Sequence, residues 1–297
     1  MSDNICYIPK VARRSASQRI RGVDYHLSLW GNDDDPLLLF AHGWGDAGSC
    51  FQFVVDELQQ RYRVIAPDWR GFGESVNRAQ SYWFPDYVAD LHEILRIYSP
   101  GQPAKLVGHS MGANIVGLYA GIYPERVAAF VNVEGFGLAD SDPGNAPANY
   151  RRWIEKSSAA PAYSRYESFE HLAERVVKRC PRLHPERALF VATEWARRAE
   201  NGGVRIKADP AHKLPNAVQY RRAEAIACWD KVTAPVLLVM GQDTDFTSAS
   251  KTWIDPDQSQ YLCQTARTLV IPDAGHMVHF EQPARLAVAI EDFFTDL

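Results

Sequence analysis

A serine flanked by glycines follows an apolar run at a point where it could act as a nucleophile. The run covers residues 104–107 and leads into Gly108-His109-Ser110-Met111-Gly112, after which small residues continue at helical spacing. A turn from strand to helix this sharp holds its central residue in a strained conformation and leaves no room for side chains two positions away on either side. The pattern predicts that Ser110 stands exposed at the carboxyl end of a sheet, over a helix N-terminus that favours negative charge.

A serine hydroxyl is a weak nucleophile at neutral pH and needs a neighbouring base. Of the nine histidines, His276 is the best candidate, because it follows the small-residue turn Asp273-Ala274-Gly275 after the last expected strand. A nucleophilic serine followed by a histidine near the C-terminus is the chain order that fits this strand–turn–helix motif. His279 is the weaker alternative, because it falls at the start of the next helical segment.

Short apolar runs alternate with segments of helical periodicity, which is typical of βαβ units and a mostly parallel sheet. Apolar runs without alternation indicate strands that are covered by helices on both faces. The expected strands are residues 37–41, 63–66, 104–107, 127–133, 236–240 and 268–271, and helical patterns occur around residues 88–98 and 286–293.

Residues 148–228 interrupt this alternation, because they contain no convincing strand. Apolar residues recur at helical spacing over 169–180, and Pro185 is placed to open a second helix. We therefore predict a core of residues 1–137 and 229–297 and a helical insertion of residues 138–228. Most aromatic side chains of the insertion are expected to pack inside it, and the remainder to line an apolar pocket; these are Trp153, Tyr163, Tyr166, Phe169, Phe190, Trp195 and Tyr220.

The insertion also differs from the rest of the chain in charge. Residues 148–228 contain 16 Lys+Arg and 9 Asp+Glu, a balance of +7, whereas the whole chain has a net charge of -4, which leaves -11 for the remainder. Solvated helix faces are the common explanation of such a bias. A basic lid that attracts acidic substrates, or a surface that docks on a partner or on acidic lipid, is the alternative.

Composition excludes several other classes of protein. The net charge of -4 over 297 residues argues against a nucleic-acid binder, and no apolar run approaches the length of about 18 residues that a membrane helix needs. The N-terminus lacks the basic and apolar stretches of a secretory signal. The five cysteines, at 6, 50, 180, 228 and 263, are scattered and odd in number, which indicates reduced thiols and a cytoplasmic protein.

Three further motifs accompany the serine turn. They are His42-Gly43-Trp44-Gly45 after one expected strand, residues 68–75 (DWRGFGES) after the next, and Gly275-His276 followed by Phe280-Glu281-Gln282-Pro283. Together with the serine turn, these motifs resemble the α/β-hydrolase superfamily over residues 20–137 and 230–297. The resemblance implies an α/β fold with a mostly parallel central sheet flanked by helices, and a helical cap inserted after the sixth core strand.

The resemblance also implies roles for particular residues. The backbone N–H groups of Trp44 and Met111 would form an oxyanion hole, which is worth several kcal/mol in a dry site. His42, Arg70 and His109 are expected to be structural, and the segment 68–75 to brace the site.

The carboxylate that orients the histidine has two possible positions in this superfamily. The commoner one follows the strand 236–240, three residues after its terminal glycine, but here that position is Thr244, between Asp243 and Asp245. The other, as in haloalkane dehalogenases, follows the strand 127–133 and corresponds to Glu134. A glutamate at the end of an apolar strand is costly to bury unless it is paired, and His276 would be its partner. We predict Glu134, with Asp243 as the alternative.

These residues together predict hydrolysis of a small ester-like substrate through an acyl-enzyme, with no metal or organic cofactor implied. Thioesters, lactones, carbon–carbon bonds and haloperoxidase chemistry remain open, because they use the same residue set. Dehalogenases and epoxide hydrolases use an aspartate where this chain has Ser110. A non-catalytic receptor on the same fold is the less favoured alternative, because every motif residue is retained.

Overall fold

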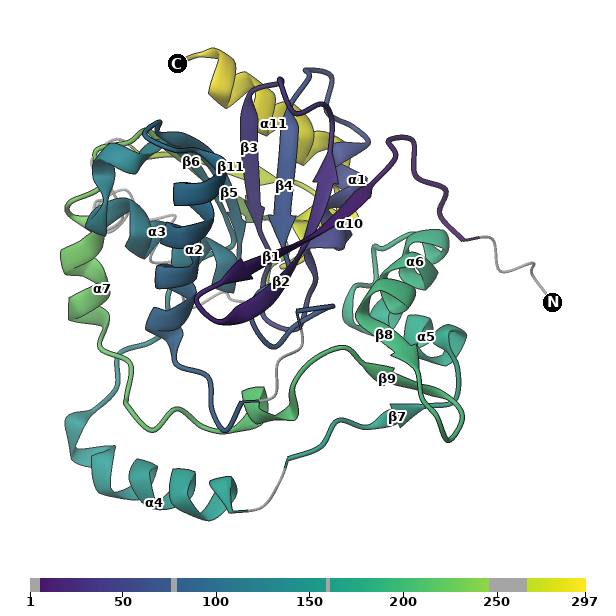
Figure 1. Cartoon of the computed structure of the whole chain (residues 1–297), viewed down its shortest axis with the longest axis vertical. Helices are drawn as coiled ribbons and strands as arrows, with labels where there is room; N and C mark the ends of the chain where they lie inside the picture. Colours follow the sequence, from purple (N-terminus) through teal and green to yellow (C-terminus); the bar gives the residue numbers. More distant parts are fainter. Residues whose placement is uncertain (1–5, 76–78, 159–160, 246–265) are drawn as a thin grey trace.

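The computed structural model describes residues 6–75, 79–158, 161–245 and 266–297; Cys263 lies outside them. A central sheet of eight strands runs through the molecule in the order β1-β2-β4-β3-β5-β6-β10-β11 (Figure 1). Its strands are β1 (Arg14–Ile20), β2 (Val23–Trp30), β3 (Leu37–Ala41), β4 (Arg63–Pro67), β5 (Ala104–His109), β6 (Val127–Val133), β10 (Val236–Gly241) and β11 (Ala266–Ile271). The pairs β1–β2 and β2–β4 are antiparallel and the other pairs are parallel.

The six strands expected from apolar runs all belong to this sheet, and the α/β fold class is confirmed. The hairpin of β1 and β2 was not predicted. In β2 the buried residues Val23, Tyr25 and Leu27 alternate with the more exposed Asp24 and His26, which is the pattern of an antiparallel strand with one covered face. A search for continuous apolar runs misses such a strand, whereas a search for period-two alternation would have found it.

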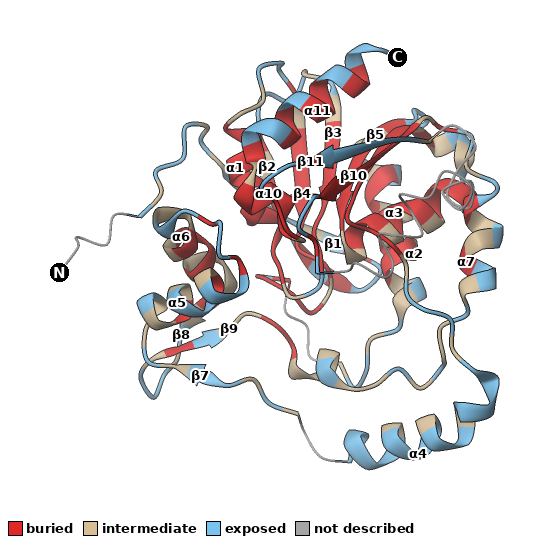
Figure 2. Ribbon diagram, turned by 180° about the vertical axis from the view of Figure 1, so that it is seen from behind, coloured by how far each residue is buried: buried red, intermediate tan, exposed pale blue. Residues whose placement is uncertain are grey.

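Helices cover both faces of the sheet. One face carries α2 (Phe84–Tyr98), α3 (Met111–Ile122) and α7 (Arg222–Trp229), and the other carries α1 (Gln52–Val55), α10 (Val278–Glu281) and α11 (Pro283–Thr295). Each face has its own apolar core, so the inner strands β3, β4, β5, β6 and β10 are buried almost throughout (Figure 2). The edge strands β1 and β11 are largely exposed, so the expected covering of both faces is wrong for the run 268–271. Short 3-10 helices occupy Gly48–Phe51, Pro124–Arg126, Pro143–Asn145 and Pro210–Lys213.

The insertion after β6 contains strands as well as helices. Its helices are α4 (Ala146–Ser157), α5 (Phe169–Arg179) and α6 (Pro185–Trp195), and the last two correspond to the predicted helices. The expectation that it holds no strand was wrong: β7 (Arg165–Tyr166), β8 (Ala196–Arg198) and β9 (Val204–Ile206) form an antiparallel sheet in the order β7-β9-β8. Strands of two or three residues are too short to show a period, and only the turn at Gly202–Gly203, where both φ angles are positive, marks them in the sequence.

Contacts with the core place the insertion over the carboxyl ends of the parallel strands. The indole Nε1 of Trp195 donates to Asp46 Oδ1 at 2.7 Å, in the loop after β3. Ala208 forms a β-bridge with Phe72, in the loop after β4. In an open α/β sheet this edge is where ligands bind.

The end of the insertion packs directly on the core. Helix α7, which spans the predicted boundary at residue 228, lies against α3, and a Cβ on Gly121 would come within 1.8 Å of the Cys228 carbonyl oxygen. Among the described residues no helix is long and apolar enough to cross a lipid bilayer. Cys6, Cys50, Cys180 and Cys228 are free thiols.

Candidate active site

Ser110 lies at the junction of β5 and α3 with a backbone conformation that few residues other than glycine adopt. Its φ and ψ are 51° and -116°, and its N–H donates to the Val133 carbonyl at 2.8 Å. The flanking glycines are needed because their neighbours are so close. A Cβ on Gly108 would lie 2.5 Å from Ala113 Cα, and one on Gly112 would lie 2.1 Å from the Ala41 carbonyl oxygen. The local sequence therefore forces the serine out of the sheet at its carboxyl edge.

His276 connects Ser110 to a buried carboxylate. It lies in the loop between β11 and α10, and its Nε2 is 3.0 Å from Ser110 Oγ. Its Nδ1 is 3.0 Å from Glu134 Oε2. A carboxylate only accepts hydrogen bonds, so a neutral His276 carries its proton on Nδ1 and presents the lone pair of Nε2 to the hydroxyl. The structure thus brings Ser110, His276 and Glu134 together in the order nucleophile, base and acid.

The Glu134 side chain takes part in hydrogen bonds at both of its carboxylate oxygens. It is buried, has a φ of 59°, and lies directly after β6. Its Oε1 accepts the N–H of Gly241 at 2.7 Å, and its Oε2 accepts the hydroxyl of Thr244 at 2.6 Å in addition to the His276 contact. Hydrogen bonds to the ionised form offset the cost of burying this charge.

The alternative carboxylates, Asp243 and Asp245, do not contact His276 among the hydrogen bonds of the described residues. Asp243 Oδ2 accepts from Arg182 at 2.7 Å, and the Asp243 side chain is 43% exposed. Asp245 is exposed. His279, the alternative base, is fully buried with its Nε2 3.0 Å from Asp46 Oδ2, away from the serine hydroxyl.

The loop after β3 lies alongside the serine. A Cβ on Gly43 would be only 3.2 Å from Ser110 Cβ. The backbone N–H of Trp44, the next residue, therefore lies close to the nucleophile. Met111 is the first residue of α3, where helical N–H groups have no partner within the helix. The Trp44 indole is 46% exposed, and its ring centroid is 6.2 Å from that of Phe72.

His42, one of the residues expected to be structural, braces this loop. The ring of His42 is buried; its Nδ1 donates to the Gly43 carbonyl at 2.7 Å and its Nε2 accepts the N–H of Trp69 at 2.8 Å. Burial lowers the pKa of His42, in keeping with this neutral form. Arg70 lies farther out and forms an ion pair with Asp90, with Nη2 and Oδ1 2.6 Å apart.

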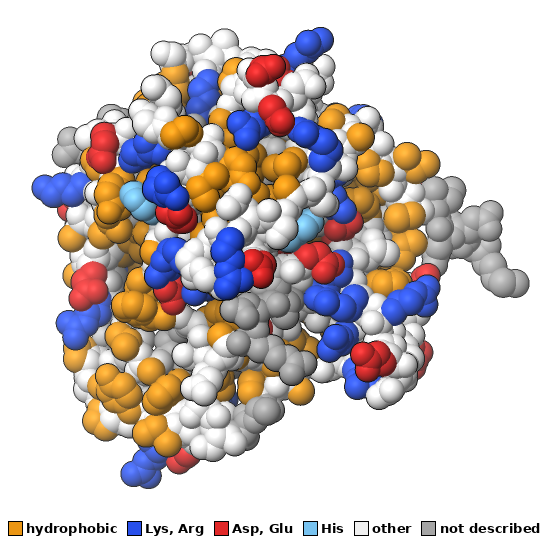
Figure 3. Space-filling model, viewed as in Figure 1, with side chains coloured by type: hydrophobic (Ala, Val, Ile, Leu, Met, Phe, Trp, Pro, Cys, Tyr) orange, Lys and Arg blue, Asp and Glu red, His pale blue; other side chains and the backbone are white. Residues whose placement is uncertain are grey.

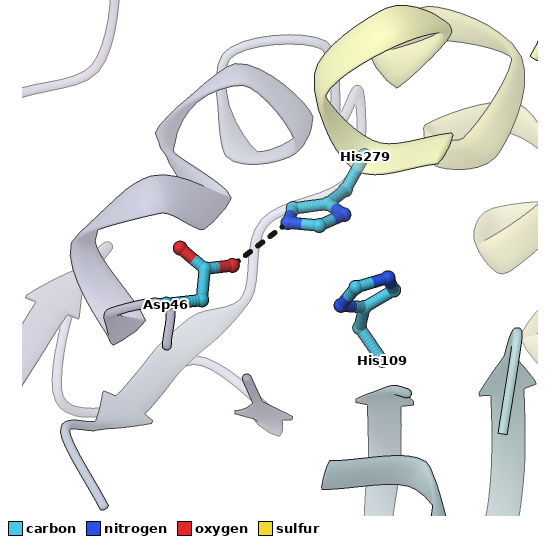
Figure 4. A group of neighbouring side chains, drawn as sticks. All are labelled: Asp46, His109 and His279. Carbon is cyan, nitrogen blue, oxygen red and sulfur yellow. Dashed lines mark hydrogen bonds and ion pairs between the residues drawn. The ribbon is translucent and has the colours of Figure 1, made fainter. Parts of the chain in front are cut away.

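Asp46, His109 and His279 form a buried cluster (Figure 4). The cluster adjoins His276, whose ring centroid is 4.9 Å from that of His109. The Nε2 of His109 donates to the His276 carbonyl at 2.9 Å, and burial lowers the pKa of His109 well below the ordinary value. One ligand atom from each of the three side chains lies within 4.8 Å of the others, and within the described chain the Nδ1 atoms of both histidines have no hydrogen-bond partner.

Two imidazoles and a carboxylate form a donor set that suits zinc. In this arrangement, however, Asp46 binds His279 and His109 supports the backbone of His276. We interpret the cluster as a brace for the loop that presents His276. Asp46 was not among the predicted site residues, and its place four residues after His42 carries no motif that would have revealed it.

Aromatic side chains of the insertion divide between packing and an open cleft. Phe190 is buried against Phe53, with ring centroids 5.2 Å apart, and the indole of Trp195 is tied to Asp46. Trp153 instead lines a cleft of about 920 Å³ between the insertion and the segment after β4.

Comparison with known proteins agrees with this architecture. The model of the alpha/beta hydrolase fold family matches residues 36–283. A serine hydrolase-like protein of Danio rerio is 27% identical over 277 residues, covering 89% of this chain and 83% of its own. The 2-(acetamidomethylene)succinate hydrolase of Mesorhizobium japonicum is 27% identical over 264 residues, covering 87% of each chain.

Solved structures show the same fold. The thioesterase domain from the curacin biosynthetic pathway superposes with a TM-score of 0.82 at 24% identity, covering 94% of this chain and 99% of that domain. The family match spans most of the chain, including the serine turn and the His276 loop. The chain belongs to the alpha/beta hydrolase fold family.

Proposed function

We propose that this protein is a serine hydrolase that cleaves ester-like small molecules through an acyl-enzyme. The observation that carries the proposal is the continuous chain of contacts from Ser110 Oγ to His276 Nε2 and from His276 Nδ1 to Glu134 Oε2, each 3.0 Å long. The similarity to a serine hydrolase-like protein supports it.

The proposed reaction has two halves. Ser110 Oγ attacks the carbonyl carbon while His276 takes the hydroxyl proton, and the N–H groups of Trp44 and Met111 stabilise the negative charge on the carbonyl oxygen. The imidazolium then gives its proton to the leaving alcohol, so the ester bond breaks and the acyl-enzyme remains. Water, deprotonated by His276, attacks the acyl-enzyme and releases the acid and the free serine.

Glu134 has a positioning and electrostatic role in this scheme. It fixes the Nδ1–H tautomer of His276 and stabilises the imidazolium that forms in each half-reaction. Its contacts with Gly241 and Thr244 prevent it from turning away.

Hydrolysis of 4-nitrophenyl acetate and labelling by a fluorophosphonate probe test the proposal. Wild-type protein should react in both assays, and Ser110→Ala should lose both while keeping the wild-type unfolding curve. Equal turnover by wild type and Ser110→Ala would overturn the proposal. A panel of matched esters, thioesters and lactones would then rank the bond types, since all three pass through the same acyl-enzyme.

A further inference from the structure

Three arginines stand in a row across the small sheet of the insertion. Arg205 on β9 is directly opposite Arg165 on β7 and, on its other side, directly opposite Arg197 on β8. Residues directly opposite each other in antiparallel strands point to the same face, with Cβ atoms about 5 Å apart. The three guanidinium groups therefore share one face of the sheet, and we call this set the arginine row.

Such a row is electrostatically unfavourable by itself, because like charges directly opposite each other destabilise a sheet. Its neighbours within the described chain neutralise it only in part. Glu74 is 3.9 Å from Arg197, but it is also bound at 2.8 Å by Lys207. In the ranges that the structure describes, neither Arg165 nor Arg205 has a carboxylate within 4.0 Å.

Two of the three members of the arginine row face open space large enough for a ligand. Arg197 and Arg205 line the cleft of about 920 Å³, a size that fits a small-molecule site. Basic side chains gather over this part of the insertion, toward the lower right of Figure 3. The buried acid of the cleft, Asp209, is already satisfied, since it accepts the Tyr82 hydroxyl at 2.8 Å and the Ala79 N–H at 2.9 Å.

The cleft adjoins the loop beside the nucleophile. Trp195, two residues before Arg197, donates to Asp46 and so fixes the start of β8 against the loop that contains Trp44. Ala208, which also lines the cleft, is bridged to Phe72, whose ring contacts that of Trp44. A substrate that lies in the cleft would therefore reach toward the serine along the Trp44 side.

We propose that the arginine row binds an anionic group of the substrate, either a carboxylate on the acyl part or a phosphate on the leaving group. The inference rests on the proposed serine hydrolase function and names its substrate class as acidic esters or thioesters. Guanidinium groups suit both anions, because their planar N–H donors bind two oxygens at once. The row would also attract such substrates at a distance, an effect that salt weakens.

Two matched substrate pairs test the proposal and separate the two sources of charge. The acyl pair is the 4-nitrophenyl monoester of adipic acid and 4-nitrophenyl hexanoate, which have equal carbon number and differ in one carboxylate. The leaving-group pair is S-butyryl-4′-phosphopantetheine and S-butyryl-pantetheine, which differ in one phosphate. The variants are Arg165→Gln and Arg205→Gln. Arg198→Gln is the control, because Arg198 lies over the Phe169 ring at 5.7 Å and its strand partner is the buried Val204.

The quantity to compare is the ratio of kcat/KM for the charged and the neutral member of a pair. We expect wild type to favour the charged member of at least one pair, and each arginine-row variant to lower that ratio about tenfold. Arg198→Gln should keep the wild-type ratio. A wild type without preference, or a preference equal in all four proteins, would overturn the inference while leaving the hydrolase intact. Loss of every activity in Ser110→Ala only is the separate check on the proposed function.

Discussion

Glu134 approaches His276 to 3.0 Å although it follows β6, whereas the superfamily more often supplies this acid from the loop after β10. The loop after β10 still takes part. Thr244, at the usual position of the acid, donates its hydroxyl to the same carboxylate oxygen at 2.6 Å. The two possible acid positions therefore converge on one point beside the imidazole, and the chain uses one as acceptor and the other as donor.

The first prediction concerns the choice of acid. Glu134→Gln should lower kcat about 10³- to 10⁴-fold, because an amide in place of the carboxylate neither fixes the productive tautomer nor stabilises the imidazolium. Asp243→Asn should stay within about threefold of wild type, since Asp243 is bound to Arg182 instead. Steady-state kinetics on 4-nitrophenyl acetate provide the comparison, and a greater loss in Asp243→Asn than in Glu134→Gln would reverse the assignment.

The second prediction follows from the position of Thr244. Because its hydroxyl contacts Glu134 Oε2, an aspartate at 244 should place a carboxylate within reach of His276 Nδ1. Adding Thr244→Asp to Glu134→Gln should recover at least tenfold of the lost kcat. Thr244→Asp alone should destabilise the protein, because two carboxylates would then share one buried site.

Thr244→Asn in the Glu134→Gln background is the matched control, since it has the same shape without the charge. If Thr244→Asn restores activity to Glu134→Gln as well as Thr244→Asp does, the shape of the side chain and not its charge is responsible for the recovery. No recovery with either, in a protein that unfolds at the same urea concentration as Glu134→Gln, would contradict the idea that the positions are equivalent.

Site residues could be predicted where the residues that fix their position are close in the sequence. The serine turn is defined by five consecutive residues, and the glycines at 108 and 112 are required by contacts within 2.5 Å, so its signal is complete in the sequence. Asp46 is different. Its partners are His279 and Trp195, 233 and 149 residues away, and only the folded chain brings them together.

The fold shows the same division. Core strands covered on both faces are continuous apolar runs and were predicted with bounds close to those observed. The small sheet of the insertion was missed because its strands are only two or three residues long, which is too short to show a period. The existence of such short strands follows from their pairing with residues distant in the sequence.

The third prediction concerns the support of His276 by His109. Replacement of His109 by leucine removes the hydrogen bond to the His276 carbonyl, so the loop should lose its alignment. We expect kcat to fall about fivefold with little change in KM, in line with about 1 kcal/mol for one hydrogen bond. His109→Gln, which keeps a donor of similar reach, should retain most of the activity. A leucine variant that loses stability but keeps its kcat would make His109 purely structural.

The fourth prediction concerns acid stability and rests on His212. Its ring lies flat between Phe72 and Tyr82, with centroid distances of 3.9 Å and 3.7 Å, and burial lowers its pKa to about 4. The unfolded chain takes up the proton near pH 6.5, but the folded protein does so only near pH 4. The free energy of unfolding should therefore be unaffected by this group above pH 6.5 and fall by about 1.4 kcal/mol per pH unit between these values.

Urea unfolding at pH 7.5 and pH 5.0 measures this effect in wild type and in His212→Phe, which keeps a flat ring between Phe72 and Tyr82. The loss of unfolding free energy between the two pH values should be smaller in the variant by about 2 kcal/mol. A loss remains, because the pKa values of the buried His42 and His109 are also lowered. His184→Gln, which changes a side chain that is 65% exposed, should behave as wild type. If His212→Phe and wild type lose equal stability on acidification, the protonation of His212 does not couple to folding.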